Sequence, residues 1–475
     1  MAQSMKGQRD HDSLGPAGWK QAPCPRQSPG VAENGDRLPA PAKTGSLRTL
    51  FCREQLWIAP VDSTAATQKD SGQRTWHRRD LLTAAIALGG ASLTACSEQP
   101  DPTRYTPEDE ARLARQREQE ERERGKGPFG EQRFQGYRGL AALPWFDLDD
   151  EGRLQLVDDS VPRAIDVHAH LGISVLFKPE LDLLAATPRV KHLLDCDGSE
   201  PGCDLDLDIY INGNFDPQAL KTLGHNTLTQ GLWGNDRLRS HTIPNLLREM
   251  DSMGVAHSVV LPIKLGLPFG DSLTEDWRHA IGSAGVEDRL LAGLSVYPGD
   301  DRAIDELRAH AATGARVVKL HPTVQKFYPD DPAVFPIYEE ARDLGLVVFY
   351  HGGRAGIEPA DRQPYALPRH YAGVLENFPG LPVVMGHAGA RDGAAMLDLA
   401  MEHDNAWLGI HGQGVSALHR IIERSGARRL LFGTDWPWYH IGATLAKVLL
   451  CTESSPELRS AILRDNALEL LPELA

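Results

Sequence analysis

The chain has 475 residues, 41% of them hydrophobic, which is enough for a barrel with additional segments. Its formal net charge is −15 at pH 7, and no basic stripe is available to neutralise phosphates, so a nucleic acid is excluded as a partner. The acidic balance indicates solubility and little else about function.

The first 76 residues are predicted to be a disordered extension. They are rich in Gly, Pro, Ser, Gln and Lys and lack apolar periodicity. No methionine lies between Met5 and Met250, yet an export signal, which follows here, normally begins a chain. We therefore hypothesise that the chain up to about Leu56 is an over-extension of the reading frame, with translation starting at a non-Met codon such as Leu56 or Val61.

Residues 77–96 show the pattern of a twin-arginine lipoprotein signal. Arg78 and Arg79 precede an apolar run at 83–92, which is shorter than the roughly 20 residues needed to span a bilayer. The following Leu-Thr-Ala-Cys resembles a bacterial lipobox with Cys96 as the lipidated residue. The sequence thus predicts an exported lipoprotein of the cell envelope, anchored in a membrane through Cys96. A chance apolar patch in a disordered tail is the alternative.

Residues 97–160 are predicted to form a charged helical tether. Thr106 and Pro107 mark a helix start, as a capping hydroxyl followed by proline in the first turn. The helix then continues to about Gly125 with almost no apolar face. We predict a solvated spacer rather than a packed element, with a partner-binding surface as the alternative.

From residue 161 onward, short β-branched runs alternate with helical patterns, which is typical of parallel βα units. The expected strands cover residues 163–170, 257–263, 290–297, 315–321, 346–351, 381–387, 406–411 and 429–435. Eight strands, each followed by a helix, predict an α/β fold, a (β/α)8 TIM barrel over residues 161–475. The alternative, an open doubly wound sheet, lacks its usual Gly-rich turn after the first strand.

A long insertion, residues 172–242, separates the first strand from the next helix. Ordinary βα loops are far shorter, so this segment is a candidate lid or specificity element. Cys196 and Cys203 flank a short Gly/Pro loop within it. In an exported protein this pair is expected to form a disulfide. Cys451 is expected to be a buried free thiol.

Polar residues end several of the expected strands, where barrel active sites lie. His168 and His170 alternate along the first strand, so both point the same way and can reach one metal ion. His351, His387 and Asp435 end the fifth, sixth and eighth strands. Zinc sites with three or four N/O ligands keep a position open for water and lower its pKa to about 7. Core packing explains such a convergence poorly.

This order of residues resembles the amidohydrolase superfamily, and more narrowly the amidohydrolase-related group that includes metal-dependent decarboxylases. Similar stretches occur at Leu247–Val255, Leu430–Pro437 and Asn466–Ala467, and the resemblance covers roughly residue 161 to the end.

The resemblance implies a role for each strand-end residue. His168, His170 and His351 would be ligands of a divalent metal, preferably zinc. Asp435 would be a ligand that also takes a proton from the metal-bound water. His387 would orient or polarise the substrate, or bind a second metal.

Three further residues are candidates in the same region. Lys319, on the fourth strand, becomes a carbamate bridging two metals in some amidohydrolases and is a neutralising charge in one-metal relatives. We predict one metal, with two as the alternative. Arg354 and Arg391 could bind a substrate carboxylate through their planar guanidinium groups. For each residue, a salt bridge within a loop is the alternative.

The predicted function is a metal-dependent hydrolase that uses metal-activated water to attack a carbonyl of a small amide, ester or lactone. A decarboxylase on the same site and a non-catalytic binding lipoprotein are the alternatives. The intact set of strand-end residues argues against the last. The sequence makes no prediction of the substrate or the oligomeric state.

Overall fold

The structure is a computed structural model that describes residues 104–173, 181–199, 203–213, 223–225, 229, 234–267 and 270–475. All of these belong to one compact unit. The predicted disordered extension, the export signal and Cys96 lie outside the described residues. Within the described ranges, no helix combines the length and apolar character needed to cross a membrane.

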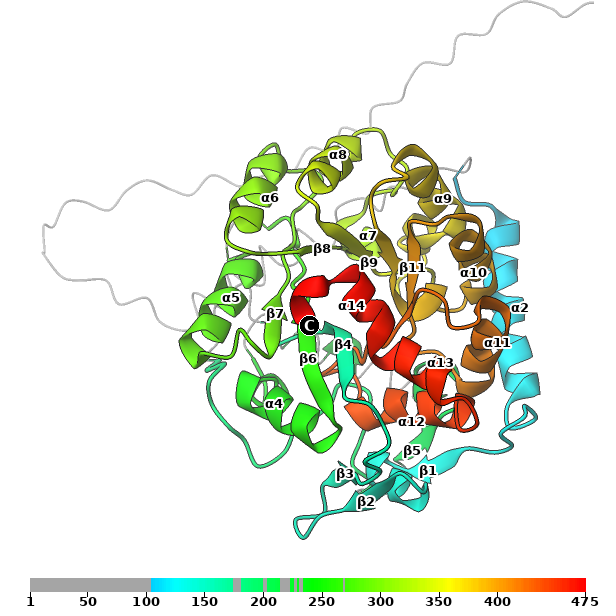
Figure 1. The fold of residues 1–475 in the computed structure, drawn as a ribbon. Coiled ribbons are helices and arrows are strands. Elements are labelled where there is room, and N and C mark those ends of the chain that lie inside the picture. Colours follow the sequence, from blue (N-terminus) through cyan, green and yellow to red (C-terminus); the bar gives the residue numbers. More distant parts are fainter. Residues whose placement is uncertain are drawn as a thin grey trace, which may run out of the picture. The chain divides into compact units, whose positions relative to one another are not determined.

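Eight parallel strands form the centre of the unit (Figure 1). They are β4 (Ala164–Ala169), β6 (Val255–Val260), β7 (Leu290–Ala292), β8 (Val317–Leu320), β9 (Val347–Tyr350), β10 (Val383–Met385), β11 (Ala406–Gly409) and β12 (Leu430–Leu431). Strands β4, β6 and β7 pair in that order, and β8 to β12 pair in chain order. Single parallel bridges, Leu294 to Val318 and Ala169 to Trp436, join the two sheets at both seams. The ring is therefore closed, and the predicted TIM barrel with its eight strands is confirmed.

Helices surround the strands in Figure 1. They are α4 (Ile243–Ser252), α5 (Leu273–Ala284), α6 (Ala303–Ala312), α7 (Pro322–Gln325), α8 (Phe335–Asp343), α9 (Pro368–Asn377), α10 (Gly393–Glu402), α11 (Val415–Ser425), α12 (Ile441–Cys451) and α13 (Pro456–Ser460). Their apolar faces turn inward; on α4, for example, Ile243, Leu246 and Met250 are buried. Gly426 ends α11 in the left-handed conformation, at φ 61°, which only glycine adopts without a steric cost.

The C-terminal segment closes one end of the barrel. Helix α14 (Asn466–Leu470) crosses in front of the strands in Figure 1. The Asn466 side chain donates to the carbonyls of Ala427 and Leu430, both at 2.8 Å, where β12 begins. Leu471 belongs to the same apolar cluster as the interior strand residues Val167 and Phe349. This end holds the strand starts, so the strand C-termini face the opposite end.

The segment before the barrel is packed, which differs from the solvated spacer that we expected. Helix α2 (Pro107–Glu123) lies beside α10 and α11 in Figure 1. Its Asp109 is buried and pairs with Arg369 at 2.9 Å. Arg124 follows the helix and pairs with Asp206 at 2.7 Å. The packed domain therefore begins well before residue 161.

Short antiparallel pairs complete this region. Strand β1 (Arg133–Gln135) pairs with β5 (Asp204–Asp206) from the insertion, and β2 (Phe146–Leu148) pairs with β3 (Leu154–Leu156). Trp145 and Phe146 join the main hydrophobic core. The remaining short helical turns are η1 (Tyr137–Ala142), η2 (Tyr210–Gly213), η3 (Leu238–Ser240), η4 (Gln363–Ala366), η5 (Gly386–Gly389), η6 (Ala461–Asp465) and η7 (Pro472–Leu474).

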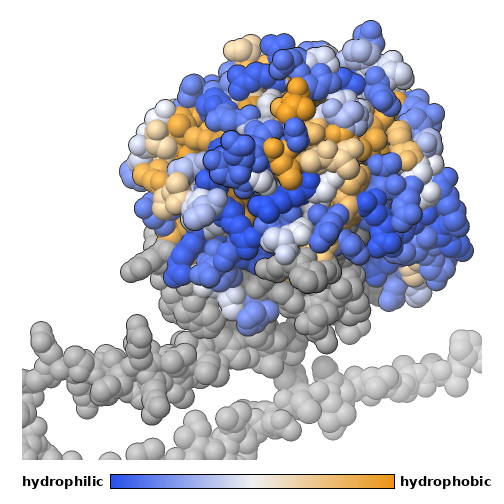
Figure 2. Space-filling model, turned by 90° about the horizontal axis from the view of Figure 1, so that it is seen from below, coloured by the Kyte–Doolittle hydropathy of each residue, from blue (hydrophilic) through white to orange (hydrophobic). Residues whose placement is uncertain are grey.

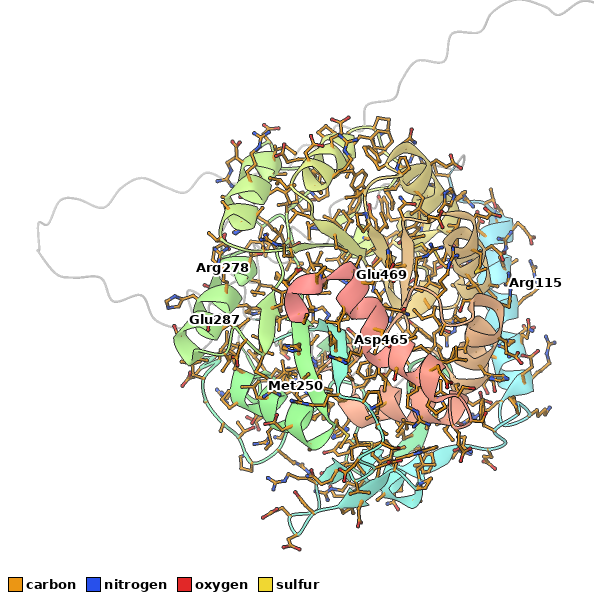
Figure 3. The ribbon with its side chains drawn as sticks, in the orientation of Figure 1. Arg115, Met250, Arg278, Glu287, Asp465 and Glu469 are labelled. Carbon is orange, nitrogen blue, oxygen red and sulfur yellow. A yellow bond between two sulfur atoms is a disulfide. The ribbon has the colours of Figure 1, made fainter. Side chains whose placement is uncertain are left out.

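The described surface is mixed in character. Figure 2 shows small hydrophobic patches separated by hydrophilic side chains on the face that it presents. On the outer side of α2, Arg115 lies at the periphery in Figure 3 and pairs with Glu108. Such exposed ion pairs contribute little to stability, so the buried contacts of α2 hold it in place.

Candidate metal centre

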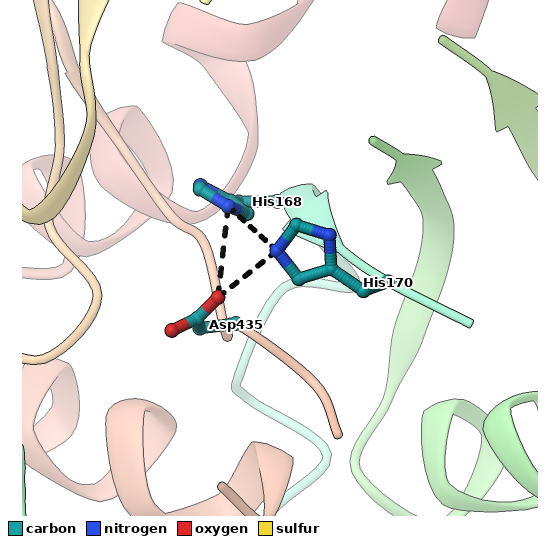
Figure 4. Close-up of side chains that lie close together, drawn as sticks. All are labelled: His168, His170 and Asp435. Carbon is teal, nitrogen blue, oxygen red and sulfur yellow. Dashed lines mark hydrogen bonds and ion pairs between the residues drawn. The ribbon is translucent and has the colours of Figure 1, made fainter. Parts of the chain in front are cut away.

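Three of the predicted ligands converge at the C-terminal ends of the strands. His168 and His170 come from the end of β4, and Asp435 follows β12 (Figure 4). The Nε2 atoms of the two histidines are 3.1 Å apart. Asp435 Oδ1 lies 3.2 Å from His170 Nε2 and 3.6 Å from His168 Nε2. Among the described residues, this is the one group of three or more His, Cys, Asp or Glu whose ligand atoms all lie within 4.8 Å of one another.

Backbone pairing between the first and last strands creates this triangle. The N–H of Asp435 donates to the carbonyl of His168 at 2.7 Å, and the N–H of His170 donates to that of Trp436 at 2.6 Å. Asp435 has a φ of 60°, an uncommon left-handed conformation for a residue with a side chain. Such strain concentrates at functional sites, and here it accompanies the turn that brings the carboxylate to the histidines.

A second contact sets the tautomer of His170. Its Nδ1 donates to the carbonyl of Leu261 at 2.7 Å, since a carbonyl oxygen can only accept. The proton is thereby held on Nδ1, and the Nε2 lone pair faces Asp435 and His168. Ligating histidines in metal proteins are oriented by such outer contacts.

Asp166 ties the two strands together beneath the triangle. Its carboxyl accepts hydrogen bonds from the hydroxyl and the N–H of Thr434, at 2.6 and 3.0 Å. It also accepts from the N–H of His168 at 3.0 Å. Burial raises the pKa of Asp166 to about 7. Sequence reasoning missed this residue, although an aspartate inside an otherwise apolar strand was a usable signal.

His351 and His387 lie beside the triangle rather than in it. Their ring centroids are 4.4 Å apart, and the ring of His387 is 5.9 Å from that of His168. His351 stacks on His321 at 4.2 Å. The structure therefore places the predicted third imidazole ligand next to the site but not among the atoms that meet within 4.8 Å.

Two histidines that we did not select as ligands also belong to this wall. His411 is 4.1 Å from His168 and 4.2 Å from His387, measured between ring centroids. Its Nε2 accepts a hydrogen bond from the N–H of His387 at 3.1 Å. His321 contacts the histidine cluster through its stacked ring contact with His351. Both residues end a strand, and that position was the signal that could have included them.

Burial keeps these side chains neutral. Burial and then the neighbouring Lys319 lower the pKa of His168 well below 6.5, and that of His351 to about 3. Burial also lowers the pKa of Lys319 to about 7. The Lys319 amine lies 3.2 Å from His168 Nε2. His168 and His351 are thus neutral imidazoles, and they lie near an amine that titrates near neutral pH.

The two arginines have partners within the protein. Arg354 is fully buried and holds both oxygens of Asp392, with Nε at 2.8 Å and Nη2 at 2.6 Å. Arg391 pairs with Glu120 of α2 at 3.1 Å. Both guanidinium groups therefore form the salt bridges that were the alternative to substrate binding. The guanidinium of Arg354 also donates to the carbonyl of Asp109, so the substrate-binding role predicted for this residue is not supported.

The insertion lies against the site. Cys196 and Cys203 form a disulfide, with their Cα atoms 5.9 Å apart. The N–H of Ile211 donates to the carbonyl of Gly412, which follows β11 in the chain, at 2.7 Å. The ring of Tyr210 is 6.3 Å from that of His387, between centroids. The described part of the insertion therefore supplies a wall of the site.

Comparison with known proteins gives one family match. The model described as Amidohydrolase matches residues 249–472, a range that contains His351, His387 and Asp435. The dihydroorotase of Ectopseudomonas mendocina is 28% identical over 163 residues, covering 30% of this chain and 47% of that protein. The dihydroorotase of Vibrio vulnificus is 25% identical over 154 residues, covering 31% and 45%. The chain thus spans somewhat less than half the length of these relatives.

Solved structures with a related fold are more distant. A TIM-barrel protein from Bordetella bronchiseptica has a TM-score of 0.44 and 23% identity, covering 50% of this chain and 85% of that one. The 5-carboxyvanillate decarboxylase of Novosphingobium aromaticivorans, complexed with manganese, has a TM-score of 0.45 and 13% identity, covering 66% and 96%.

Proposed function

Because this chain belongs to the amidohydrolase superfamily, we propose that it is a metal-dependent hydrolase of a small amide, ester or lactone. The main observation that supports this proposal is the buried triangle of His168, His170 and Asp435. Two imidazole nitrogens and a carboxylate oxygen form a donor set suited to zinc, which is the ion we propose. The fixed tautomer of His170 supports this, because it leaves Nε2 free to act as a ligand.

His351 is proposed as a further ligand, reached by a small movement from its stack on His321. When bound, the metal would lower the pKa of a water and polarise the carbonyl. Asp435 would hold the proton taken from that water, and His387 would orient the substrate. The Lys319 amine beside His168 fits a neutralising charge, and we therefore propose one metal rather than two.

Decarboxylation on the same site is the second candidate. It would require a group that holds a substrate carboxylate, and Lys319 supplies a cation next to the proposed ligands whenever it is protonated. Assaying carbonyl hydrolysis and decarboxylation in parallel would distinguish the two reactions.

The test is elemental analysis of the purified chain together with turnover on a panel of aryl esters, lactones, amides and hydroxybenzoates. We expect about one zinc per chain. We expect the Asp435→Asn variant to lose at least about 100-fold in kcat, as is typical when a positioned proton acceptor is removed. Asp404→Asn is the matched control, since Asp404 is exposed on the surface, and it should keep full activity.

Unchanged turnover in Asp435→Asn would refute the mechanism. A chain that binds no metal after reconstitution would refute the metal centre. We also propose export and lipid attachment at Cys96 on the strength of the motif. Mass spectrometry of the protein isolated from its natural source, with an unmodified Cys96, would refute that attachment.

A further inference from the structure

Tyr210 of the insertion stands next to the proposed catalytic residues with an unused hydroxyl. The residue is only 2% exposed, and none of the described residues forms a hydrogen bond with its hydroxyl oxygen. Leaving a buried hydroxyl unpaired is unfavourable, and buried polar groups in native proteins nearly always have a partner. The hydroxyl therefore needs a partner that the described residues do not supply.

The hydroxyl-bearing end of the ring lies beside His387. A Cβ placed on Gly412 would be 3.2 Å from Tyr210 Cε2, 3.6 Å from its Cζ, and 3.2 Å from His387 Nδ1. His387 Nδ1 is also buried and has no partner among the described residues. Two side chains with unsatisfied polar atoms thus approach the same position beside Gly412, at the edge of the imidazole cluster.

We propose that the Tyr210 hydroxyl is a substrate-binding residue, which donates a hydrogen bond to an oxygen of the bound carbonyl or carboxylate compound. The inference rests on the proposed function, because it places that oxygen at the metal centre. Burial raises the pKa of Tyr210 well above 10, so the hydroxyl keeps its proton and acts as a donor at neutral pH.

Helix α2 holds Tyr210 in this position. One carboxylate oxygen of Glu120 accepts a hydrogen bond from the N–H of Tyr210. The other pairs with Arg391 at 3.1 Å, and the Arg391 guanidinium lies 5.1 Å from the Tyr210 ring centroid. Glu120 is thus a positioning residue that joins the helix before the barrel to the wall of the site.

The test compares wild type with Tyr210→Phe and Tyr338→Phe, all loaded with zinc. Tyr338, on α8, is a matched control because it is also fully buried. Its hydroxyl, however, already donates a hydrogen bond to the carbonyl of Pro329 at 2.9 Å. Acetohydroxamate serves as the oxyanion probe, and calorimetry measures its Kd. Elemental analysis of each variant gives the metal content separately.

We expect Tyr210→Phe to weaken acetohydroxamate binding by about tenfold or more, as for a lost hydrogen bond to a charged group, with unchanged zinc content. Tyr338→Phe should bind the probe like wild type. Equal affinity of wild type and Tyr210→Phe would overturn the inference while leaving the metal centre intact. A zinc-loaded wild type that does not bind the probe would also overturn it, since no oxyanion would then reach the hydroxyl. Absence of zinc from wild type would instead refute the proposed function itself.

Discussion

Lys447 on α12 is a buried lysine that is not among the proposed site residues. It is 2% exposed, and burial lowers its pKa to about 8, against the opposing effect of Asp195 and other carboxylates. Between pH 8 and about 10.5 the unfolded chain binds a proton on this lysine that the folded protein does not. The free energy of unfolding should therefore rise with pH across this window. Below pH 8 the contribution of Lys447 to this free energy should not depend on pH.

We expect the stability of wild type relative to Lys447→Met to increase by roughly 3 kcal/mol between pH 8 and 10.5, at about 1.4 kcal/mol per pKa unit. Urea unfolding of both metal-free proteins over this range measures the difference. Because the free energies of unfolding of the two proteins are subtracted, the contributions of the other groups that titrate in this pH range cancel. A difference that stays constant with pH would show that Lys447 is charged in the folded state.

Some site residues were predictable one at a time, and others were not. The alternation of His168 and His170 along a strand already places both rings on one side. The partner of Arg354 could not be predicted in this way, because Asp392 is 38 positions away and the carbonyl of Asp109 is 245 positions away. A charged side chain that follows a strand can either bind a ligand or form a salt bridge. Only the tertiary contacts distinguish these two roles.

At the level of elements, helix α2 is held by a few polar contacts. Asp109 accepts from Arg369 at 3.0 and 2.9 Å and from the N–H of Thr106 at 2.9 Å, and Thr106 caps the helix in return. We expect Asp109→Ala to destabilise the docked helix by about 1–3 kcal/mol, through the loss of the cap and of a partly exposed ion pair.

Hydrogen exchange of the backbone of Pro107–Glu123 provides the measurement. Exchange in Asp109→Ala should be faster along this helix, while the barrel strands keep their protection. Glu118→Ala is the control, since Glu118 is exposed on the same helix. Equal exchange in both variants would mean that other contacts dock the helix.

The sequence misjudged α2 for a physical reason. Hydrophobic periodicity detects helices that bury an apolar stripe, whereas only Leu113 and the polar Asp109 are buried on this one. A helix docked by charged side chains has the same sequence pattern as a solvated one. The barrel helices, in contrast, bury apolar faces and were therefore recognisable.

For the molecule as a whole, the C-terminal segment closes the barrel at the end away from the site. Leu471 is 3% exposed and packs with the interior strand residues. We expect Leu471→Ala to lower the free energy of unfolding by about 2–4 kcal/mol, as for buried leucines elsewhere. The metal content of the folded fraction should not change, since the proposed ligands are at the opposite end of the barrel.

Urea unfolding and elemental analysis test this pair of expectations. Leu148→Ala is the control, because Leu148 is 40% exposed on β2, and it should change stability by less than about 0.5 kcal/mol. Loss of metal from folded Leu471→Ala would show that the two ends of the barrel are coupled.

All eight strands could be predicted, because each is a short, mostly apolar run between helical patterns. Their ends were less accurate: β12 covers Leu430–Leu431, whereas we expected residues 429–435. The residues after Leu431 leave the ladder to form the turn that carries Asp435, and a strand pattern alone does not reveal that departure. The contacts of the insertion were equally unpredictable, since loops of this length have no regular period.

The closing bridge between Ala169 and Trp436 also bears on how the protein is made. His170 and Asp435 are 265 positions apart, so the ribosome adds 265 further residues after His170 before both side chains exist. Throughout this interval a nascent chain carries the paired histidines without the carboxylate that completes the triangle. Capture of the proposed metal by this triangle therefore has to wait until the strand ends that close the ring have been synthesised.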